Sequence, residues 1–314
     1  MKGLRVGVHV AASNAKGLVE GIAAAEAAGI ECAWLTSGGV APDPLAVFSA
    51  AALRTERILF GTSIIPTFPR HPLAMAQGAL AVDALAPGRL RLGVGPSHRP
   101  TMEGQWGIAF ERPLEHLREY LTVLRAILND GEVQFEGKRM TARARIASPT
   151  GVRIMASALR ANGFRLCGEL ADGAISWVCP LPYLRDVAVP AIQEGAASAG
   201  REAPPLIAHV PVIVSENVES VRQGAARQIG LYPRVPFYSQ MFQDAGFPEA
   251  AEGTLSERMI DALVVHGTEE QVKERLRQLP SYGAAELLAM PITPQDDAGA
   301  LPRTLHALGE LARE

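Results

Sequence analysis

The sequence predicts a single (β/α)8 TIM barrel over residues 1–314, with insertions after the fourth and the seventh strand. Short apolar runs alternate with amphipathic segments along the whole chain, and about eight such pairs follow one another. The runs at 59–65 and 90–94 are apolar on all sides, as parallel strands covered by helices on both faces must be. The segment 72–85 between them keeps one apolar face and predicts a helix. This unbroken alternation favours one domain over two.

Helix signals set the element boundaries in the first half. Pro72 suits a first helical turn, where no N–H is needed, and Asp43 precedes another helix start. Gly29 is a typical residue after the last turn of a helix. The predicted strands are 4–10, 32–36, 59–65 and 90–94, and the predicted helices are 16–28, 44–54, 72–85 and 113–128.

The second half departs twice from simple alternation. Residues 132–146 alternate around a Glu-Gly turn, which predicts a solvent-exposed hairpin. Residues 217–266 exceed one barrel helix, and their aromatic- and proline-rich part at 232–262 predicts an excursion that covers the active site or a partner subunit. The other predicted strands are 152–157, 173–178, 206–214 and 286–290, and the other helices are 162–170, 182–199, 268–279 and 301–312.

Composition bounds the function classes. The chain is 48% hydrophobic and 20% charged, with a net charge of −3 and no basic run. We therefore expect a soluble enzyme acting on a small molecule, with neither nucleic acid nor a membrane as partner. No segment resembles a signal peptide or a membrane span, so a cytoplasmic location is expected. The three cysteines, Cys32, Cys167 and Cys179, lack metal-site spacing and are expected to be buried thiols, with no metal bound.

Polar residues follow two neighbouring strands at their carboxyl ends. Thr62, Ser63 and Thr67 end the third strand, and Ser97 and His98 follow the fourth. Barrel enzymes carry their active sites at this end, so one ligand is expected to touch both groups.

A series of motifs along the chain resembles the luciferase-like flavin and deazaflavin oxidoreductases. SHRP at 97–100 and SW at 176–177 are similar to the branch that uses the deazaflavin coenzyme F420. The match spans nearly the whole chain. The other motifs are GTSI at 61–64, PRHPL at 69–73, DALAPGR at 83–89, LGVG at 92–95, EYL at 119–121, GELADG at 168–173 and AGR at 199–201.

The resemblance implies an oxidoreductase that transfers a hydride between F420 and an unidentified small organic substrate. Two alternatives stay open: a monooxygenase that uses reduced FMN and oxygen, and a non-catalytic cofactor-binding protein. The resemblance further implies a cis peptide bond between Ser63 and Ile64 behind the cofactor ring, against an ordinary trans strand end. Together with the Ala-rich early helices, it implies a homodimer.

Three aromatic side chains are candidates for the chemistry. His98 matches the position of the acid in related deazaflavin enzymes, and an imidazole that titrates near neutrality can donate a proton or bind the cofactor carbonyl. The alternative is a loop histidine that caps backbone or binds water. His9, at the end of the first strand, is a second acid or substrate ligand, or else a core histidine. Trp177 stacks on a ligand or lies in the core.

The turn before the fifth helix is the predicted phosphate site. Free N–H groups at a helix start attract phosphate, and Arg160 adds positive charge. Relatives are glycine-rich there, whereas this chain carries Arg-Ala. Arg70 and His71 are expected to be mainly structural. The predicted cofactor-binding residues are Thr62, Ser63, Ile64, Ser97, His98, Ser157, Ala158, Arg160, Ala161 and Trp177.

One departure from the family concerns the segment after the second strand. Many relatives carry Asp-His there, whereas residues 36–39 read TSGG. In the sugar-phosphate dehydrogenases of the family, that histidine takes part in catalysis. Because this chain lacks it, we do not expect the sugar-phosphate reaction here. The acid role is then expected to fall on His98.

Overall fold

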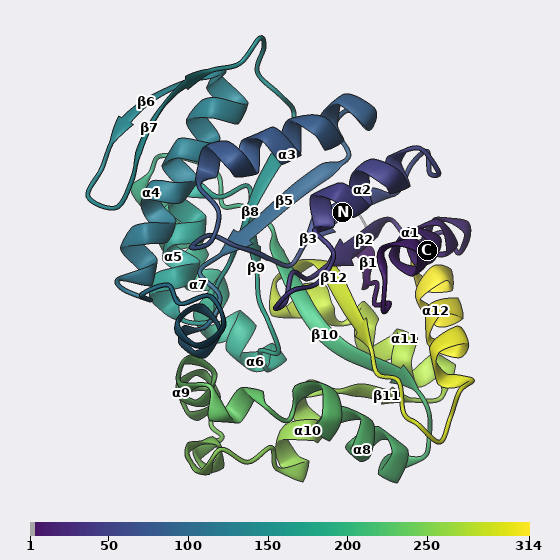
Figure 1. The fold of residues 1–314 in the computed structure, drawn as a ribbon. Helices are drawn as coiled ribbons and strands as arrows, with labels where there is room; N and C mark the ends of the chain where they lie inside the picture. Colours follow the sequence, from purple (N-terminus) through teal and green to yellow (C-terminus); the bar gives the residue numbers. More distant parts are fainter. Residues whose placement is uncertain (1–3) are drawn as a thin grey trace.

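The computed structural model describes residues 4–314, and within them eight parallel strands close into a barrel (Figure 1). The strands follow one another around the barrel in chain order. Strand β10 pairs with both β9 and β12, and β12 pairs with β1, which closes the ring. The fold prediction is therefore confirmed. The barrel strands are β1 (Arg5–His9), β2 (Cys32–Leu35), β3 (Leu59–Thr62), β5 (Leu90–Gly95), β8 (Arg153–Ser157), β9 (Gly173–Ile175), β10 (Leu206–Val214) and β12 (Ala284–Pro291).

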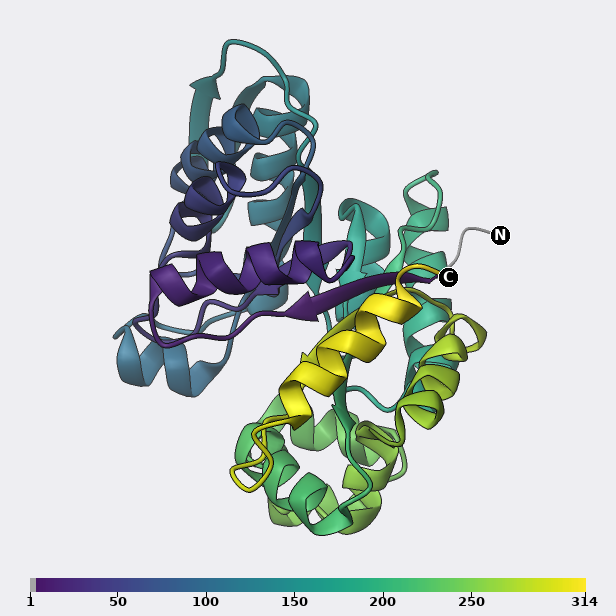
Figure 2. The same ribbon diagram turned by 90° about the vertical axis from the view of Figure 1, so that its right-hand side faces the viewer.

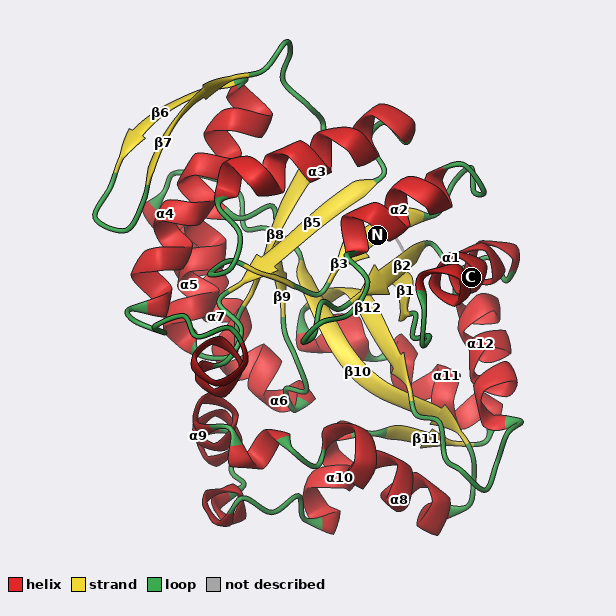
Figure 3. Ribbon diagram, viewed as in Figure 1, coloured by secondary structure: helices red, strands yellow, loops and turns green. Residues whose placement is uncertain are grey.

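Helices surround the strands (Figure 3). The capping residues are those that the sequence indicates: Asp43 accepts the Leu45 N–H at 2.8 Å, and Thr268 forms a capping box with Gln271. Figure 2 shows α12 alongside β1, where it completes the ring of helices. The helices around the barrel are α1 (Ala15–Ala27), α2 (Pro44–Ala52), α3 (Pro72–Leu85), α4 (Pro113–Arg125), α5 (Ala161–Leu170), α7 (Val189–Ser198), α8 (Val218–Ile229), α11 (Glu269–Arg277) and α12 (Ala300–Leu311).

The helix predicted at 182–199 is interrupted. It consists of the short α6 (Leu181–Tyr183), a π-helical turn at Leu184–Ala188, and α7. Pro190 lies in the first turn of α7. Because proline has no N–H to donate to the preceding turn, a regular α-helical ladder cannot run through this position.

The insertion after strand four is the predicted hairpin, formed by β6 (Glu132–Glu136) and β7 (Thr141–Arg145). It is not fully exposed, because Val133 and Ala142 are buried. The Glu119 carboxylate of α4 accepts the N–H groups of Lys138 and Arg139, both at 2.8 Å. The hairpin is thus fastened to the barrel by one buried acid.

The insertion after strand seven folds over one end of the barrel. It contains a 3-10 turn at Tyr232–Arg234, α9 (Pro236–Asp244), a second 3-10 turn at Pro248–Glu252, and α10 (Glu257–Leu263). It ends in a strand that the sequence did not indicate, β11 (Val265–Gly267), which pairs with β10 outside the barrel ring. Another short strand, β4 (Ile65–Pro66), pairs with β5.

The barrel interior is filled rather than hollow. Trp34 of β2 occupies its centre, and a Cβ at Gly7 or Gly61 on the adjacent strands would come within 2.5 Å and 2.3 Å of the indole. Below it, Arg91 of β5 and Glu286 of β12 form a buried ion pair. The three cysteines are free and buried, as predicted. Within residues 4–314, no helix combines the length and the apolarity needed to cross a bilayer.

Candidate active site

A cavity of about 1080 Å³ opens at the carboxyl ends of the barrel strands, where the sequence predicts the site. Ser63 and Ile64 after β3, His98 after β5 and Trp177 after β9 all line it. The excursion after strand seven contributes Tyr232, Phe237, Tyr238 and Asp244 to the cavity lining. The predicted site residues among its lining are Ser63, Ile64, Ser97, His98, Ser157, Ala158, Arg160, Ala161 and Trp177.

The chain bends at Ser63 and Ile64, directly after strand β3, and both residues line the cavity. The peptide bond between Ser63 and Ile64 is cis, which confirms the prediction made from the family resemblance. The Thr36 hydroxyl donates to the Ser63 carbonyl oxygen at 3.1 Å, and the Ser37 N–H donates to the Ile64 carbonyl oxygen at 3.2 Å. The segment after β2 therefore holds the bend, a role that sequence reasoning missed.

Thr62 does not belong to the cavity. It is fully buried, and its hydroxyl donates to the Gly93 carbonyl oxygen and accepts the Gly93 N–H, both at 2.7 Å. Because the hydroxyl is fully used in joining β3 to β5, the prediction that Thr62 binds cofactor is not supported. Ser63 points into the cavity instead, as expected for adjacent residues of an extended chain.

His98 is half-buried at the cavity surface, and Ser97 before it adopts a left-handed conformation with φ of +64°. The ring meets Tyr238 edge to face, with centroids 5.4 Å apart. Burial lowers the pKa of His98, so the imidazole is neutral at neutral pH. Neighbouring Arg99 turns away and donates to the Phe110 carbonyl oxygen at 2.9 Å. His98 is therefore the one ionisable group of this loop that faces the cavity.

His9 lies outside the lining. Its ring is edge-on to Trp177, which does line the cavity, with centroids 6.4 Å apart. Burial lowers the pKa of His9 to about 4. A ring that stays neutral and does not line the cavity fits the alternative of a core histidine better than that of a second acid.

Trp177, Tyr232 and Tyr238 form one part of the cavity lining, which we call the aromatic wall. The Trp177 indole N–H donates to the Tyr232 hydroxyl oxygen at 2.6 Å, and the rings of Tyr232 and Tyr238 lie 4.5 Å apart. His209 of β10 stacks on the far side of Trp177. The aromatic-rich excursion was the signal for Tyr232 and Tyr238, whereas no local pattern marks His209.

The predicted phosphate site lies at the start of α5. Residues 157–163 line the cavity, and no side chain caps this helix. Arg160 is paired with Asp244 of α9, with Nε and Oδ2 3.2 Å apart. A Cβ on Gly95 would come within 2.2 Å of the Ser157 hydroxyl, so the absence of a side chain at Gly95 leaves room for this hydroxyl. The arrangement offers unpaired backbone donors, while a carboxylate offsets the Arg160 charge.

Arg70 and His71 are held by structural contacts, as the sequence analysis expected. His71 caps α3: its Nδ1 accepts the Leu73 N–H at 3.2 Å. Arg70 lines the cavity but forms an ion pair with Asp43.

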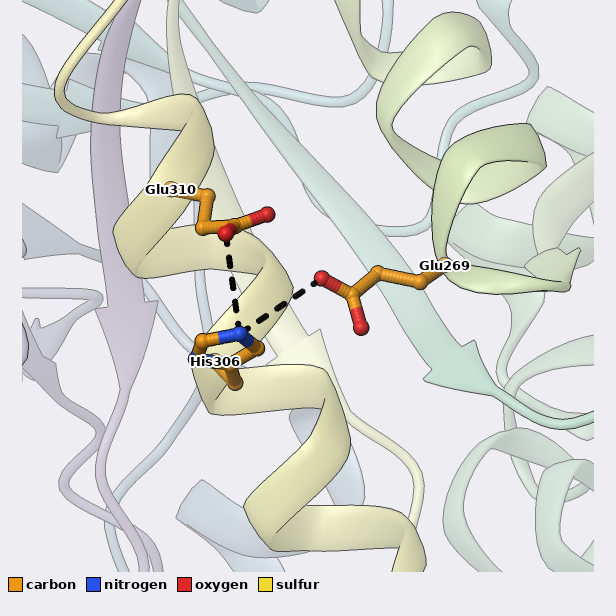
Figure 4. A group of neighbouring side chains, drawn as sticks. All are labelled: Glu269, His306 and Glu310. Carbon is orange, nitrogen blue, oxygen red and sulfur yellow. Dashed lines mark ion pairs between the residues drawn. The ribbon is translucent and has the colours of Figure 1, made fainter.

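A second group of ionisable side chains lies far from the cavity, between α11 and α12 (Figure 4). The His306 Nε2 atom is 3.8 Å from a Glu269 oxygen and 3.6 Å from a Glu310 oxygen. Lys273 already supplies positive charge there, with its Nζ 2.7 Å from Glu310. We interpret the group as an exposed ion-pair network that ties the last two helices together.

A family profile described as luciferase-like monooxygenase matches residues 3–286. An F420-dependent glucose-6-phosphate dehydrogenase from Nocardia farcinica is 35% identical over 181 residues, which cover 54% of this chain and 53% of that enzyme.

Two solved structures share the fold over almost their whole length. An F420-dependent secondary alcohol dehydrogenase in complex with an F420-acetone adduct superimposes with a TM-score of 0.82 at 17% identity, covering 98% of both chains. The oxygenating constituent of 3,6-diketocamphane monooxygenase from Pseudomonas putida, in complex with FMN, gives 0.76 at 18% identity, covering 99% of this chain and 98% of that one. At such identities the likeness concerns the fold.

Proposed function

The chain belongs to the luciferase-like monooxygenase family, and from this premise we propose that it transfers a hydride between coenzyme F420 and a small organic substrate. The observation that carries the proposal is that His98 and the Ser63–Ile64 bend, which follow neighbouring strands, line the same cavity. A ring-binding surface and a proton-handling group would thus meet the same ligand. The matches to F420-dependent enzymes support F420 as the cofactor, and FMN is the alternative.

The residues present fit such a cofactor. The cavity volume of about 1080 Å³ is slightly above the usual range of about 300–1,000 Å³ for ligand sites, so a large cofactor and a small substrate have room. Ser63, Ile64 and Ser97 would hold the ring, and the uncapped start of α5 with Arg160 would hold the phosphate. When bound, the deazaflavin supplies or accepts the hydride.

His98 would manage the proton that accompanies hydride transfer. Since burial lowers its pKa, the ring is a base at neutral pH and can take the hydroxyl proton of an alcohol during oxidation. In the reverse direction, the protonated ring would donate its proton to the carbonyl oxygen of the substrate as hydride reaches the carbonyl carbon, which gives the alcohol.

Cofactor titration followed by a substrate panel tests the proposal. We expect purified protein to bind F420, seen as a change in its absorbance, and to consume it when a substrate is oxidised or reduced without oxygen. Tight FMN binding with oxygen-dependent turnover would favour the monooxygenase instead. Cofactor binding with no turnover over a broad panel would favour a non-catalytic binding protein.

A further inference from the structure

The hydroxyl group of Tyr232 has no role in the hydride transfer proposed above, although Tyr232 lines the cavity. Tyr232 comes from the excursion after strand seven and lines the cavity beside Trp177. An indole nitrogen can only donate a hydrogen bond. In the 2.6 Å contact between the two side chains, the Tyr232 oxygen must therefore be the acceptor.

The direction of this bond leaves the Tyr232 proton free. In the part of the chain that the structure describes, no second side chain or carbonyl group hydrogen-bonds to this oxygen. A phenol proton that is turned away from the indole and has no acceptor in the protein is available to a ligand in the cavity. Acceptance from the indole N–H also polarises the phenol and strengthens it as a donor.

Tyr232 differs in this respect from its neighbour Tyr238. The Tyr238 ring packs between Tyr232 and His98, but no hydrogen bond of the described residues orients its hydroxyl. The Tyr232 hydroxyl is fixed by Trp177, which is itself fixed by its stack on His209. Of the two phenols, Tyr232 is the preorganised donor.

The charges around the cavity limit what this donor can bind. The lining contains two arginines, Arg70 and Arg160, and each is paired with a carboxylate, Asp43 or Asp244. Arg160 is assigned above to the cofactor phosphate, and Arg70 is held by Asp43, so no cation of the described lining is left for an anionic substrate. The rest of the wall near Tyr232 is aromatic, which suits an uncharged, largely apolar molecule.

We propose that Tyr232 donates the hydrogen bond that holds the oxygen of an uncharged carbonyl or alcohol substrate. This inference rests on the proposed function in placing the substrate between the aromatic wall and the cofactor. Trp177 acts as the positioning residue, because it sets the direction in which the Tyr232 proton points.

Two probes of matched shape test the donor without requiring turnover. Cyclohexanone carries an oxygen where methylenecyclohexane carries a CH2 group, and ligand-observed NMR gives both dissociation constants in the cofactor-loaded protein. In Tyr232→Phe we expect the preference for the ketone to fall about fivefold to tenfold, as loss of one hydrogen bond implies. Trp177→Phe, which keeps an aromatic ring but removes the N–H, should lower it by about twofold to threefold.

A matched control lies outside the cavity. Tyr282 packs under the Arg185 guanidinium, and Tyr282→Phe should change the preference less than about twofold. Equal effects of Tyr232→Phe and Tyr282→Phe would overturn the role of Tyr232. Tighter binding of cyclohexyl phosphate than of cyclohexanone would overturn the uncharged substrate class. Absence of F420 and FMN binding would instead refute the proposed function, while the probe ratio in cofactor-free protein would still test Tyr232.

Discussion

The imidazole of His209 lies face to face with the indole of Trp177, with centroids 3.7 Å apart and planes 20° from parallel. The Val178 N–H donates to the Nδ1 atom of His209 at 3.1 Å, and Val178 reaches this position in a left-handed conformation with φ of +49°. Burial and the nearby His9 keep the pKa of His209 well below its usual value. A neutral, fixed ring thus supports the aromatic wall from inside the barrel.

Replacement of His98 by alanine tests its proposed role as the proton-handling group. We expect turnover to fall about 100-fold or more while cofactor affinity changes by no more than a few-fold, because general acid–base catalysis is lost and binding is kept. Steady-state kinetics and a cofactor titration measure both. His306→Ala, an exposed change far from the cavity, should leave both unaffected. Normal turnover in His98→Ala would refute the assignment.

Removal of the Asp244 charge should strengthen binding of the anionic cofactor. Asp244→Asn keeps the size of the side chain but releases Arg160 from its ion pair at the phosphate site. We expect about threefold to tenfold tighter binding at low salt and a smaller gain at high salt, as screened charges require. Glu257→Gln, which breaks the remote pair with Arg222, is the matched control. Weaker cofactor binding in Asp244→Asn would place the phosphate elsewhere.

The buried Arg91–Glu286 pair should be critical for stability. Glu286→Leu leaves the Arg91 charge without its partner inside the barrel and should lower the free energy of unfolding by about 3–5 kcal/mol. The double variant with Arg91→Met should recover most of that loss. Urea unfolding measures each value, and the exposed Arg277–Glu314 pair should contribute under about 1 kcal/mol. A double variant no more stable than Glu286→Leu would contradict the charge argument.

Stability should decline as the pH falls below about 6.5. His9 has a pKa of about 4 in the folded protein, lower than its value of 6.5 when unfolded. The unfolded chain therefore takes up the proton first, so the stability present above pH 6.5 is lost progressively down to pH 4, by at most about 3 kcal/mol. Thermal unfolding against pH measures this loss. His9→Gln should flatten the decline, and an unchanged slope would show that other groups cause it.

We propose that the protein forms a homodimer through its early helices. Helices α2 and α3 pack together, and their carboxyl ends expose Leu53 and Leu85, with 73% and 45% of each residue accessible. Light scattering at micromolar concentration should give the mass of a dimer, and Leu53→Glu with Leu85→Glu should shift it towards the monomer, because charges are costly to bury. Lys substitution of Leu301, also exposed but on α12, is the control. A monomeric mass for the unmodified protein would refute the proposal.

The barrel, and the end of it at which the cavity opens, could be predicted from the sequence. Residues such as Asp43 and Pro72 favour a helix start through their own backbone and side-chain chemistry, so they predict it without knowledge of the tertiary contacts. All-apolar runs also predict covered parallel strands without reference to partners. The cis bond at Ser63 came from a family motif, since no local rule predicts one.

Which side chains share the cavity could not be predicted, because this depends on contacts between segments far apart in the chain. Adjacent residues of a strand point to opposite sides, so only one of Thr62 and Ser63 can face the cavity. The sequence does not say which one; the bond from Thr62 to Gly93 of β5 shows that it is Ser63. Tyr232 meets Trp177 across 55 positions of sequence, and Arg160 meets Asp244 across 84. Such contacts depend on how the excursion folds back over the barrel, and no residue pattern near either partner encodes that path.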